Sequence, residues 1–128
     1  MQDYQPVNLW TIKNQYPLPL IPQLIDCLHN CTLFTGFNIE WGYNKVLIKD
    51  KDQWKAAFIT NEGLYEPMVM FFRLTNLLAT FQMMMNTIFC DLIDGGNVII
   101  YMDDIAIHTE LRQGETHEEH VKQHRKLV

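Results

Sequence analysis

The segment Tyr-Met-Asp-Asp at residues 101–104 is the part of this chain whose residue types point most directly to chemistry. Its adjacent carboxylates, Asp103 and Asp104, lie between short apolar runs at 98–100 and 105–107, which predicts two strands joined by a tight turn. Neighbouring carboxylates repel each other, and a divalent cation between them relieves that repulsion. A solvated turn is the alternative interpretation, because Asp favours turns on its own.

Four further blocks precede this tetrapeptide. They are NQYPLPLI at 14–21, FT and WGYN within 34–44, WKAAF at 54–58, and LTN with ATFQ within 74–82. The types and order of these blocks resemble the reverse transcriptases of gypsy-type LTR retrotransposons, in which Tyr-Met-Asp-Asp forms the catalytic hairpin. The resemblance runs from about residue 3 to the C-terminus. Several blocks in the right order are far more specific than one short motif.

The resemblance implies a fold and an activity. The expected fold is α+β, a reverse-transcriptase-like palm with partial fingers, in which a mostly antiparallel sheet is backed by helices. The ancestral activity is RNA-directed DNA synthesis by two-metal nucleotidyl transfer, with Mg²⁺ as cofactor and Mn²⁺ as a substitute. By resemblance, Asp103 ligates metal and Asp104 supports or partly ligates it. The implied partners are an RNA/DNA template-primer and deoxynucleoside triphosphates.

One catalytic position of the family differs in this chain. By the resemblance, the other essential carboxylate position is occupied by Asn38. A neutral amide is a poor substitute where hard divalent cations need a bridging anion. We expect catalysis to be impaired by about a thousandfold or more, since each ~1.4 kcal/mol of transition-state stabilisation is worth tenfold in rate. Glu40 lies on the same strand face, two residues further along, and is a poorly placed replacement.

Four residues match positions that bind nucleotide in the family. Tyr43 matches the bulky residue that stacks under the sugar, although a core aromatic residue at a strand end is the alternative interpretation. Phe72 and Arg73 match a Phe-Gly pair, so Arg73 either contacts phosphate or blocks the pocket. Gln82, in the ATFQ block, belongs to the same expected nucleotide-binding set.

The departures from the family share a mutational pattern. Asp to Asn at 38, Gly to Arg at 73, Arg to Gln at 5 and 15, and the replacements that leave leucines at 77 and 78 each require one C-to-T transition on one DNA strand or the other. Selection for a new function is not expected to choose that set. The hypothesis is a retrotransposon polymerase that decayed without selection for catalysis. Codons more than one transition from the family codons would count against it.

Three alternatives stay open at this point. The first is a catalytically dead remnant that binds nucleic acid or nucleotide weakly. The second is an unrelated metal-dependent phosphohydrolase that uses Asp103 and Asp104, which requires a third acid nearby and leaves the upstream blocks unexplained. The third is a chain that does not fold stably alone, because missing segments normally cover its sheet edges.

Length and composition set broader bounds. A chain of 128 residues with 48% hydrophobic residues is sufficient for one domain with a core. A formal net charge of −5 with ten basic residues does not favour strong nucleic-acid binding by this chain alone.

By the resemblance, we expect residues 1–128 to be a partial domain, from the fingers and palm through the hairpin, without thumb, RNase H or the remaining polyprotein segments. With no apolar run of signal-peptide or membrane-spanning length, an intracellular, cytoplasmic or nuclear protein without membrane contact is expected.

The cysteines and histidines carry weaker signals. The three cysteines form no disulfide framework, which favours a reducing compartment and buried thiols over a zinc site. His117, His120 and His124 recur along one face of the last segment. A solvated helix face is the preferred interpretation there, with metal binding by the His120/His124 pair as the weaker alternative.

Hydrophobic periodicity and turn residues predict the remaining elements. Prolines oppose helix in the first twenty residues, and Gly95-Gly96 ends the longest helical pattern. The expected elements are an extended segment at 1–20, helices at 21–29, 75–93 and 115–128, and, besides the hairpin, strands at 33–37, 45–48, 55–59 and 64–70.

Overall fold

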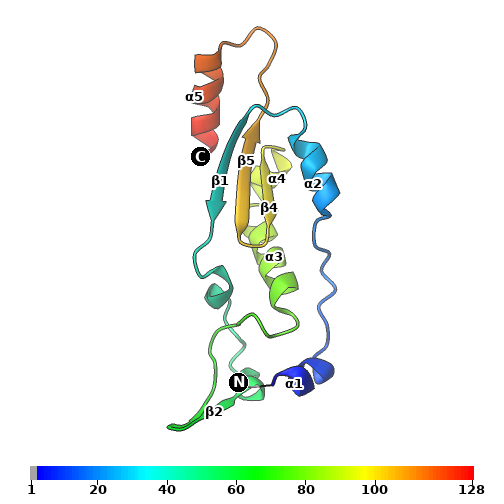
Figure 1. The fold of residues 1–128 in the computed structure, drawn as a ribbon, viewed down its shortest axis with the longest axis vertical. Coiled ribbons are helices and arrows are strands. Elements are labelled where there is room, and N and C mark those ends of the chain that lie inside the picture. The colour runs from blue at the N-terminus through cyan, green and yellow to red at the C-terminus, as the bar shows by residue number, and fades with distance from the viewer. Residues whose placement is uncertain (1–2) are drawn as a thin grey trace.

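A computed structural model describes residues 3–128 of the chain. Its centre is a three-stranded antiparallel sheet in the order β1-β5-β4, which helices α3 and α4 cover on one face (Figure 1). This arrangement confirms the predicted α+β class, a mostly antiparallel sheet backed by helices. The helices and strands are α1 (Gln5–Trp10), α2 (Ile21–Leu28), β1 (Leu33–Asn38), β2 (Phe58–Thr60), β3 (Gly63–Tyr65), α3 (Leu77–Ile88), α4 (Cys90–Asp94), β4 (Val98–Tyr101), β5 (Asp104–Thr109) and α5 (His117–Leu127).

The predicted hairpin is present. Strand β4 pairs with β5 until Tyr101 meets Asp104, which leaves Met102 and Asp103 as the two-residue turn. Strand β1 pairs with the other edge of β5 and ends where Asn38 meets Asp104. Because directly opposed residues of antiparallel strands share a face, this register sets Asn38, Asp104 and Tyr101 side by side at one end of the sheet.

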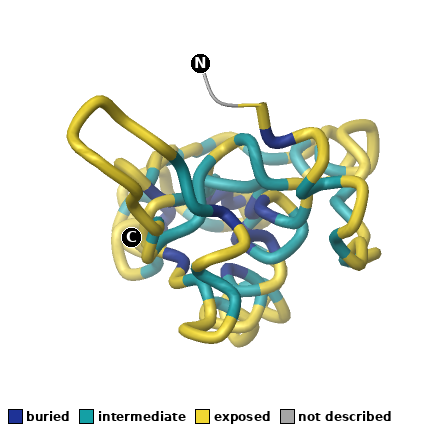
Figure 2. The backbone as a smooth tube through the Cα atoms, turned by 90° about the horizontal axis from the view of Figure 1, so that it is seen from below, coloured by how far each residue is buried: buried dark blue, intermediate teal, exposed yellow. Residues whose placement is uncertain are grey.

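Alternate residues of the sheet form the core against α3. In β4, Val98 and Ile100 are buried whereas their neighbours are partly exposed, as expected for a strand with one covered face. Figure 2 shows the buried segments gathered in the middle of the molecule. Each such apolar side chain contributes about 1.5–3 kcal/mol when removed from water. The core cluster consists of Val46, Phe81, Met85, Val98, Ile100 and Ile107.

The long helix predicted at 75–93 is two helices. Helix α3 ends before Phe89, whose φ of −107° and ψ of 18° are not helical, and α4 follows directly. The Phe89 N–H still donates to the Met85 carbonyl, so the break leaves that backbone group paired. Phe89 at the break and Ile93 in α4 both pack against the core cluster. The type of this element is confirmed and its continuity is wrong.

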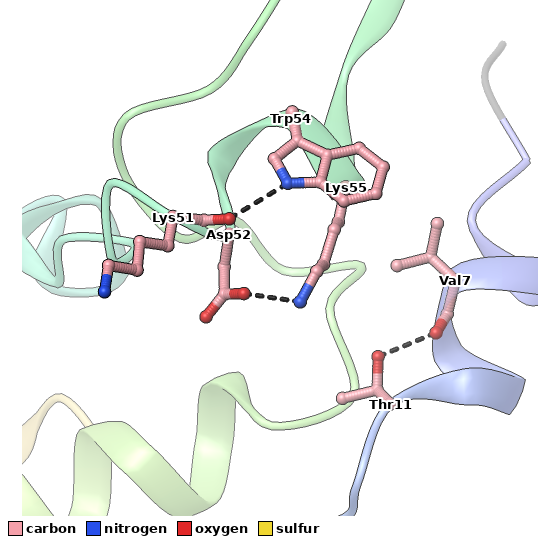
Figure 3. Close-up of polar contacts among 6 residues, drawn as sticks. All are labelled: Val7, Thr11, Lys51, Asp52, Trp54 and Lys55. Carbon is pink, nitrogen blue, oxygen red and sulfur yellow. Dashed lines mark hydrogen bonds and ion pairs between the residues drawn. The ribbon is translucent and has the colours of Figure 1, made fainter.

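The extended segment predicted at 1–20 contains a short helix. Pro6 lies in the first turn of α1, where the missing N–H removes no helical hydrogen bond, so proline is compatible with a helix there. The Thr11 hydroxyl donates to the Val7 carbonyl at the end of this helix, at 2.7 Å (Figure 3). Residues 12–20 are non-helical, as predicted.

The strands predicted at 45–48, 55–59 and 64–70 are largely wrong. The 3₁₀ helix Gly42–Lys45 includes only the first residue of the first predicted strand, and the 3₁₀ helix Gln53–Ala56 includes the first two residues of the second. Strand β2 pairs with β3 instead of with the first of these segments, and Leu47 makes an isolated antiparallel bridge to Val69. Strands β2 and β3 lie outside the central sheet, below its hairpin end, at the bottom of Figure 1.

Local polar contacts explain the 3₁₀ turn at residues 53–56. The Trp54 indole N–H donates to the Lys51 carbonyl at 2.9 Å, and the Lys55 ammonium forms an ion pair with Asp52 (Figure 3). Both contacts span three residues, which is the spacing that a 3₁₀ turn brings together. Periodicity of apolar residues does not detect such contacts.

Helix α5 confirms the helix predicted at 115–128. Thr116 and Glu119 form a complete capping box at its N-terminus, which satisfies two backbone N–H groups that otherwise lack partners. Acidic residues occupy the first turn and basic residues the last, in agreement with the helix dipole.

The solvated histidine face predicted on this helix is wrong for two of the three histidines. His117 is exposed, but His120 and His124 are buried at 2% and 7% exposure. Both are hydrogen-bonded at 2.9 Å to the Thr109 hydroxyl of β5, and His124 is also bonded to Thr35 of β1 at 2.8 Å. Hydroxyl groups both donate and accept hydrogen bonds, so Thr109 and Thr35 can pair with the imidazole nitrogens of these histidines and allow their burial.

The buried thiols expected from the sequence are also not found. Cys27 and Cys90 are exposed, and Cys31 is partly exposed with its Sγ 3.1 Å from Nδ1 of the buried His108. All three cysteines are free. Within residues 3–128, no helix has the length and apolar character needed to cross a membrane.

Candidate catalytic site

The turn between β4 and β5 presents the two carboxylates. Met102 has a φ of 56°, in the left-handed region that few residues other than glycine adopt. This conformation suits a two-residue hairpin, because left-handed turn residues match the twist of the flanking strands. Asp103 is partly exposed at the turn and Asp104 is exposed at the start of β5.

Asn38 contacts this pair directly. Its Nδ2 donates a hydrogen bond to Oδ1 of Asp104 at 2.9 Å, across the register that joins the ends of β1 and β5. The chain therefore places Asn38 beside the hairpin, where the sequence resemblance puts a family carboxylate. The side chain offers a neutral N–H donor to the carboxylate at this contact.

Tyr43 contacts the other carboxylate. Its hydroxyl lies 3.2 Å from Oδ1 of Asp103 and 3.6 Å from the sulfur of Met102. Burial, and then the negative charge and hydrogen bond of Asp103, raise the pKa of Tyr43 to about 12. At neutral pH the hydroxyl is therefore protonated and donates to Asp103.

Helix α3 packs against the Tyr43 ring through Phe81. The ring of Phe81 meets Tyr43 edge to face at a centroid distance of 4.9 Å. Gly42 permits this close approach, since a Cβ at that position would meet the Phe81 ring at 2.8 Å. Tyr43 thus packs on the core, in agreement with the alternative interpretation made from the sequence, and its hydroxyl reaches the hairpin. Stacking of Tyr43 under a sugar stays a prediction.

Gln82 lies beneath the hairpin with no exposed surface. Its Oε1 accepts a 2.7 Å hydrogen bond from the Met102 N–H, and its Nε2 donates to the Ile100 carbonyl and to Asn86. Contact between Gln82 and a nucleotide stays a prediction, and the amide is engaged with the hairpin.

A pocket opens beside Tyr43. It is lined by Trp41, Tyr43, Asn44 and Phe72, with a volume of about 200 Å³. Phe72 is thus brought to the same pocket as Tyr43. The guanidinium of Arg73 lies over the Phe72 ring, 5.6 Å from its centroid, in a cation–π contact.

Two asparagines to which the sequence analysis gave no role, Asn8 and Asn76, hold the loop before α3. Asn8 donates to the Arg73 carbonyl at 2.9 Å and accepts from the Thr75 N–H at 3.0 Å. Asn76 accepts from the Asn14 N–H and donates to the Ile12 carbonyl. These asparagine side chains hydrogen-bond to backbone groups outside helices and strands. Periodicity of apolar residues therefore cannot predict them. The presence of Asn76 in the LTN block was the one sequence feature that could have indicated this role.

The donor set is not that of a two-ion site. Among residues 3–128, no group of three or more His, Cys, Asp or Glu side chains is arranged to hold a metal ion. Asp103 and Asp104 supply two anionic side chains, but Asn38 supplies a neutral amide whose N–H already bonds Asp104. The third acid that an unrelated phosphohydrolase would need is likewise missing from this cluster.

The fold belongs to a known class of solved structures. A foamy viral protease-reverse transcriptase in complex with an RNA/DNA hybrid superposes with a TM-score of 0.73 over 98% of this chain and 16% of that chain, at 20% identity. The same protein type solved with double-stranded DNA gives a TM-score of 0.75 over 98% of this chain and 20% of that one. The fold is therefore that of a reverse transcriptase.

Sequence comparison then gives the family. An RNA-directed DNA polymerase homolog of Oenothera berteroana is 38% identical over 120 residues, covering 94% of this chain and 82% of that protein. The Transposon Tf2-3 polyprotein of Schizosaccharomyces pombe is 36% identical over 120 residues, which are 9% of its length. The profile of the family described as reverse transcriptase (RNA-dependent DNA polymerase) matches residues 1–128, so the chain belongs to this family.

Proposed function

We propose that residues 1–128 form the fingers and palm parts of a gypsy-type RNA-directed DNA polymerase whose nucleotidyl transfer is impaired by Asn38. The observation that carries this proposal is the 2.9 Å hydrogen bond from Asn38 to Asp104, at the end of the strand register beside the hairpin. A side chain in this position is close enough to share a cation with the hairpin carboxylates if it carries an anion.

The impairment follows from the donor chemistry at this position. A carboxylate there would supply two anionic oxygens, whereas the amide supplies one neutral oxygen and an N–H group that repels cations. Removing one anion from a divalent-metal site weakens both metal binding and the stabilisation of charge that develops during phosphoryl transfer. The side chains of this chain, with Asn38 in place, therefore do not fit a two-ion site.

The substrate classes rest on the pocket and on the relatives. The pocket beside the carboxylates is lined by Trp41, Tyr43 and Phe72, flat side chains suited to a sugar or base. The structural relatives were solved with an RNA/DNA hybrid and with double-stranded DNA. We propose a template-primer and a deoxynucleoside triphosphate as the ligands, and Mg²⁺ or Mn²⁺ as the cation of the ancestral site.

The test compares the parent chain with Asn38→Asp. Mn²⁺ binding is measured by electron paramagnetic resonance in the presence of a deoxynucleoside triphosphate, with a nucleotide-only control. We expect a protein-dependent Mn²⁺ site in Asn38→Asp and a much weaker one in the parent. Equal binding by both chains would mean that Asn38 is not the cause of impairment. Absence of binding in both folded chains would overturn the assignment of the metal site.

A second candidate function is a binding remnant without turnover. It is favoured by the same donor set, which lacks a third acid while the aromatic pocket is retained. Fluorescence anisotropy with a labelled RNA/DNA hybrid at several salt concentrations tests it, because binding through phosphates weakens as salt rises. Salt-dependent binding with no primer extension in Mg²⁺ or Mn²⁺ would favour the remnant. Extension by the parent chain would exclude it.

A further inference from the structure

Gln82 is a polar side chain with 0% exposure in the middle of α3. A buried amide is costly unless its donors and acceptor are paired. Gln82 meets this requirement through three hydrogen bonds: Oε1 accepts from Met102 at 2.7 Å, and Nε2 donates to the Ile100 carbonyl at 3.1 Å and to Asn86 at 2.9 Å. Two of these three bonds go to the backbone of the hairpin that carries the carboxylates.

The two backbone groups lie on the unpaired edge of the sheet. Strand β4 is the last in the order β1-β5-β4, so one of its edges has no neighbouring strand among residues 3–128. The Ile100 carbonyl and the Met102 N–H are two residues apart, the spacing at which a strand presents a carbonyl and an N–H to the same neighbour. The Gln82 amide, with its own carbonyl and N–H, bonds the two groups that the N–H and carbonyl of a residue on a further strand would otherwise pair.

This contact is made at Met102, which with Trp41 is one of two non-glycine residues with a positive φ in the described part of the chain. Met102 has a φ of 56°, a conformation that is unfavourable for a side chain with a Cβ and persists only where the surroundings hold it. The 2.7 Å bond from the Met102 N–H to Gln82 is such a restraint. The next two residues along the chain are Asp103 and Asp104.

We propose that Gln82 is a positioning residue for the carboxylate hairpin. Its amide continues the edge of β4, holds Met102 in the left-handed conformation, and so fixes the direction in which Asp103 and Asp104 leave the turn. The consequence for ligand binding rests on the function proposed above, whereas the restraint on the hairpin does not. Direct contact between the Gln82 amide and a nucleotide would require these bonds to break first.

The first readout is amide hydrogen exchange of the full chain, followed by NMR. The test variant is Gln82→Met, which keeps an unbranched side chain of similar size and removes the amide. The matched control is Met85→Ala, one helical turn away in the core and without a hydrogen bond to the turn. Loss of one net hydrogen bond corresponds to about tenfold faster exchange. We expect that change at Met102 in Gln82→Met beyond any global loss of stability, and only the global change in Met85→Ala.

Gln82→Glu keeps the acceptor for Met102 and loses the Nε2 donor. We expect this variant to retain slow exchange at Met102, within about threefold of the parent, since that single bond is kept. Unchanged Met102 exchange in Gln82→Met would overturn the proposal, as would equal acceleration in Met85→Ala. If Gln82→Met does not fold, fast Met102 exchange in a folded Gln82→Glu overturns it.

The second readout tests the consequence for the carboxylates. In the Asn38→Asp background, we expect Gln82→Met to weaken Mn²⁺ binding by about tenfold, because misplaced ligands lose affinity, while Met85→Ala changes it by less than about twofold. Equal Mn²⁺ affinity of Asn38→Asp with and without Gln82→Met would overturn the positioning role. If Asn38→Asp itself binds no Mn²⁺, the proposed function fails, and Met102 exchange alone decides the role of Gln82.

Discussion

Replacement of Asn38 by Asp should make the stability of this protein depend on a divalent cation. In the parent, the amide N–H of Asn38 stabilises the Asp104 carboxylate through a 2.9 Å hydrogen bond. The substitution removes that donor and brings a third negative charge to the hairpin. Without a cation, the folded state must then hold the carboxylates of residues 38, 103 and 104 together against their mutual repulsion.

The size of the effect follows from these contacts. A hydrogen bond to a charged group contributes about 1.5 kcal/mol, at the low end of its range for exposed partners such as these. Repulsion between unit charges about 4 Å apart adds ~1 kcal/mol in water-like surroundings. The sum of about 2–3 kcal/mol corresponds to a fall in melting temperature of about 10 °C for a domain of this size.

A saturating cation should reverse this loss. At a hundred times its dissociation constant, a ligand that binds the folded state alone stabilises it by about 2.7 kcal/mol. We therefore expect Asn38→Asp to melt about 10 °C below the parent in chelator and close to the parent in excess Mn²⁺. The parent should change little between the two conditions. The assay is a thermal melt followed by circular dichroism at constant ionic strength.

An exchanged pair serves as the control. The double variant Asn38→Asp with Asp104→Asn has the same charge as the parent and restores an amide–carboxylate hydrogen bond in the opposite sense. It should recover most of the stability in chelator and gain nothing from Mn²⁺. If Asn38→Asp alone is as stable as the parent in chelator, the two side chains do not face each other, and the register between β1 and β5 has been misassigned.

Three further perturbations have defined outcomes. Burial, and to a lesser degree the charge of His124, lower the pKa of His108 from 6.5, so the unfolded chain binds a proton that the folded state rejects. Stability should therefore be full above pH 6.5 and fall as the pH drops through the folded pKa, and urea melts of His108→Gln should show a flatter profile from pH 7 to 5. Asn8→Ala should cost about 1–3 kcal/mol by removing the side-chain hydrogen bonds to the Arg73 carbonyl and to the Thr75 N–H, measured by urea unfolding against Thr87→Ala as an exposed control. A loss below about 0.5 kcal/mol would contradict a stabilising role for these two bonds. Gly42→Ala should cost about 1–3 kcal/mol in the same assay, because its Cβ would collide with the Phe81 ring, and an unchanged midpoint would contradict that close approach.

The sequence predicted the parts of the fold that depend on repeated local patterns. The apolar runs around the Asp pair predicted the hairpin, and the helical spacing of residues 77–92 predicted the helical character of α3 and α4 but not the break between them. Pairing of β1 with β5 could not be read from periodicity, because it depends on contacts between residues far apart in the chain. The same holds for the burial of His120 and His124, which polar composition assigned to solvent but Thr109 and Thr35 satisfy from the sheet.

The candidate site divides in the same way. Order and residue type were sufficient to nominate Asp103, Asp104, Asn38 and Tyr43, and the structure brings these four within hydrogen-bond distance of one another in pairs. The packing around these residues could not be predicted from the sequence. Whether a glutamine in a helix touches a ligand or a strand edge depends on the packing of α3 against β4, which only coordinates reveal.

The exposure of the tryptophans decides how this protein can be observed. Trp10, Trp41 and Trp54 are 90%, 71% and 62% exposed, so their emission should already be red-shifted in the native state and should change little on unfolding. Intrinsic fluorescence is therefore a poor probe of the core. Trp41 alone lines the pocket, which makes it a local reporter of occupancy. With phenylalanine at positions 10 and 54, quenching of the remaining indole should isolate events at that pocket from the rest of the molecule.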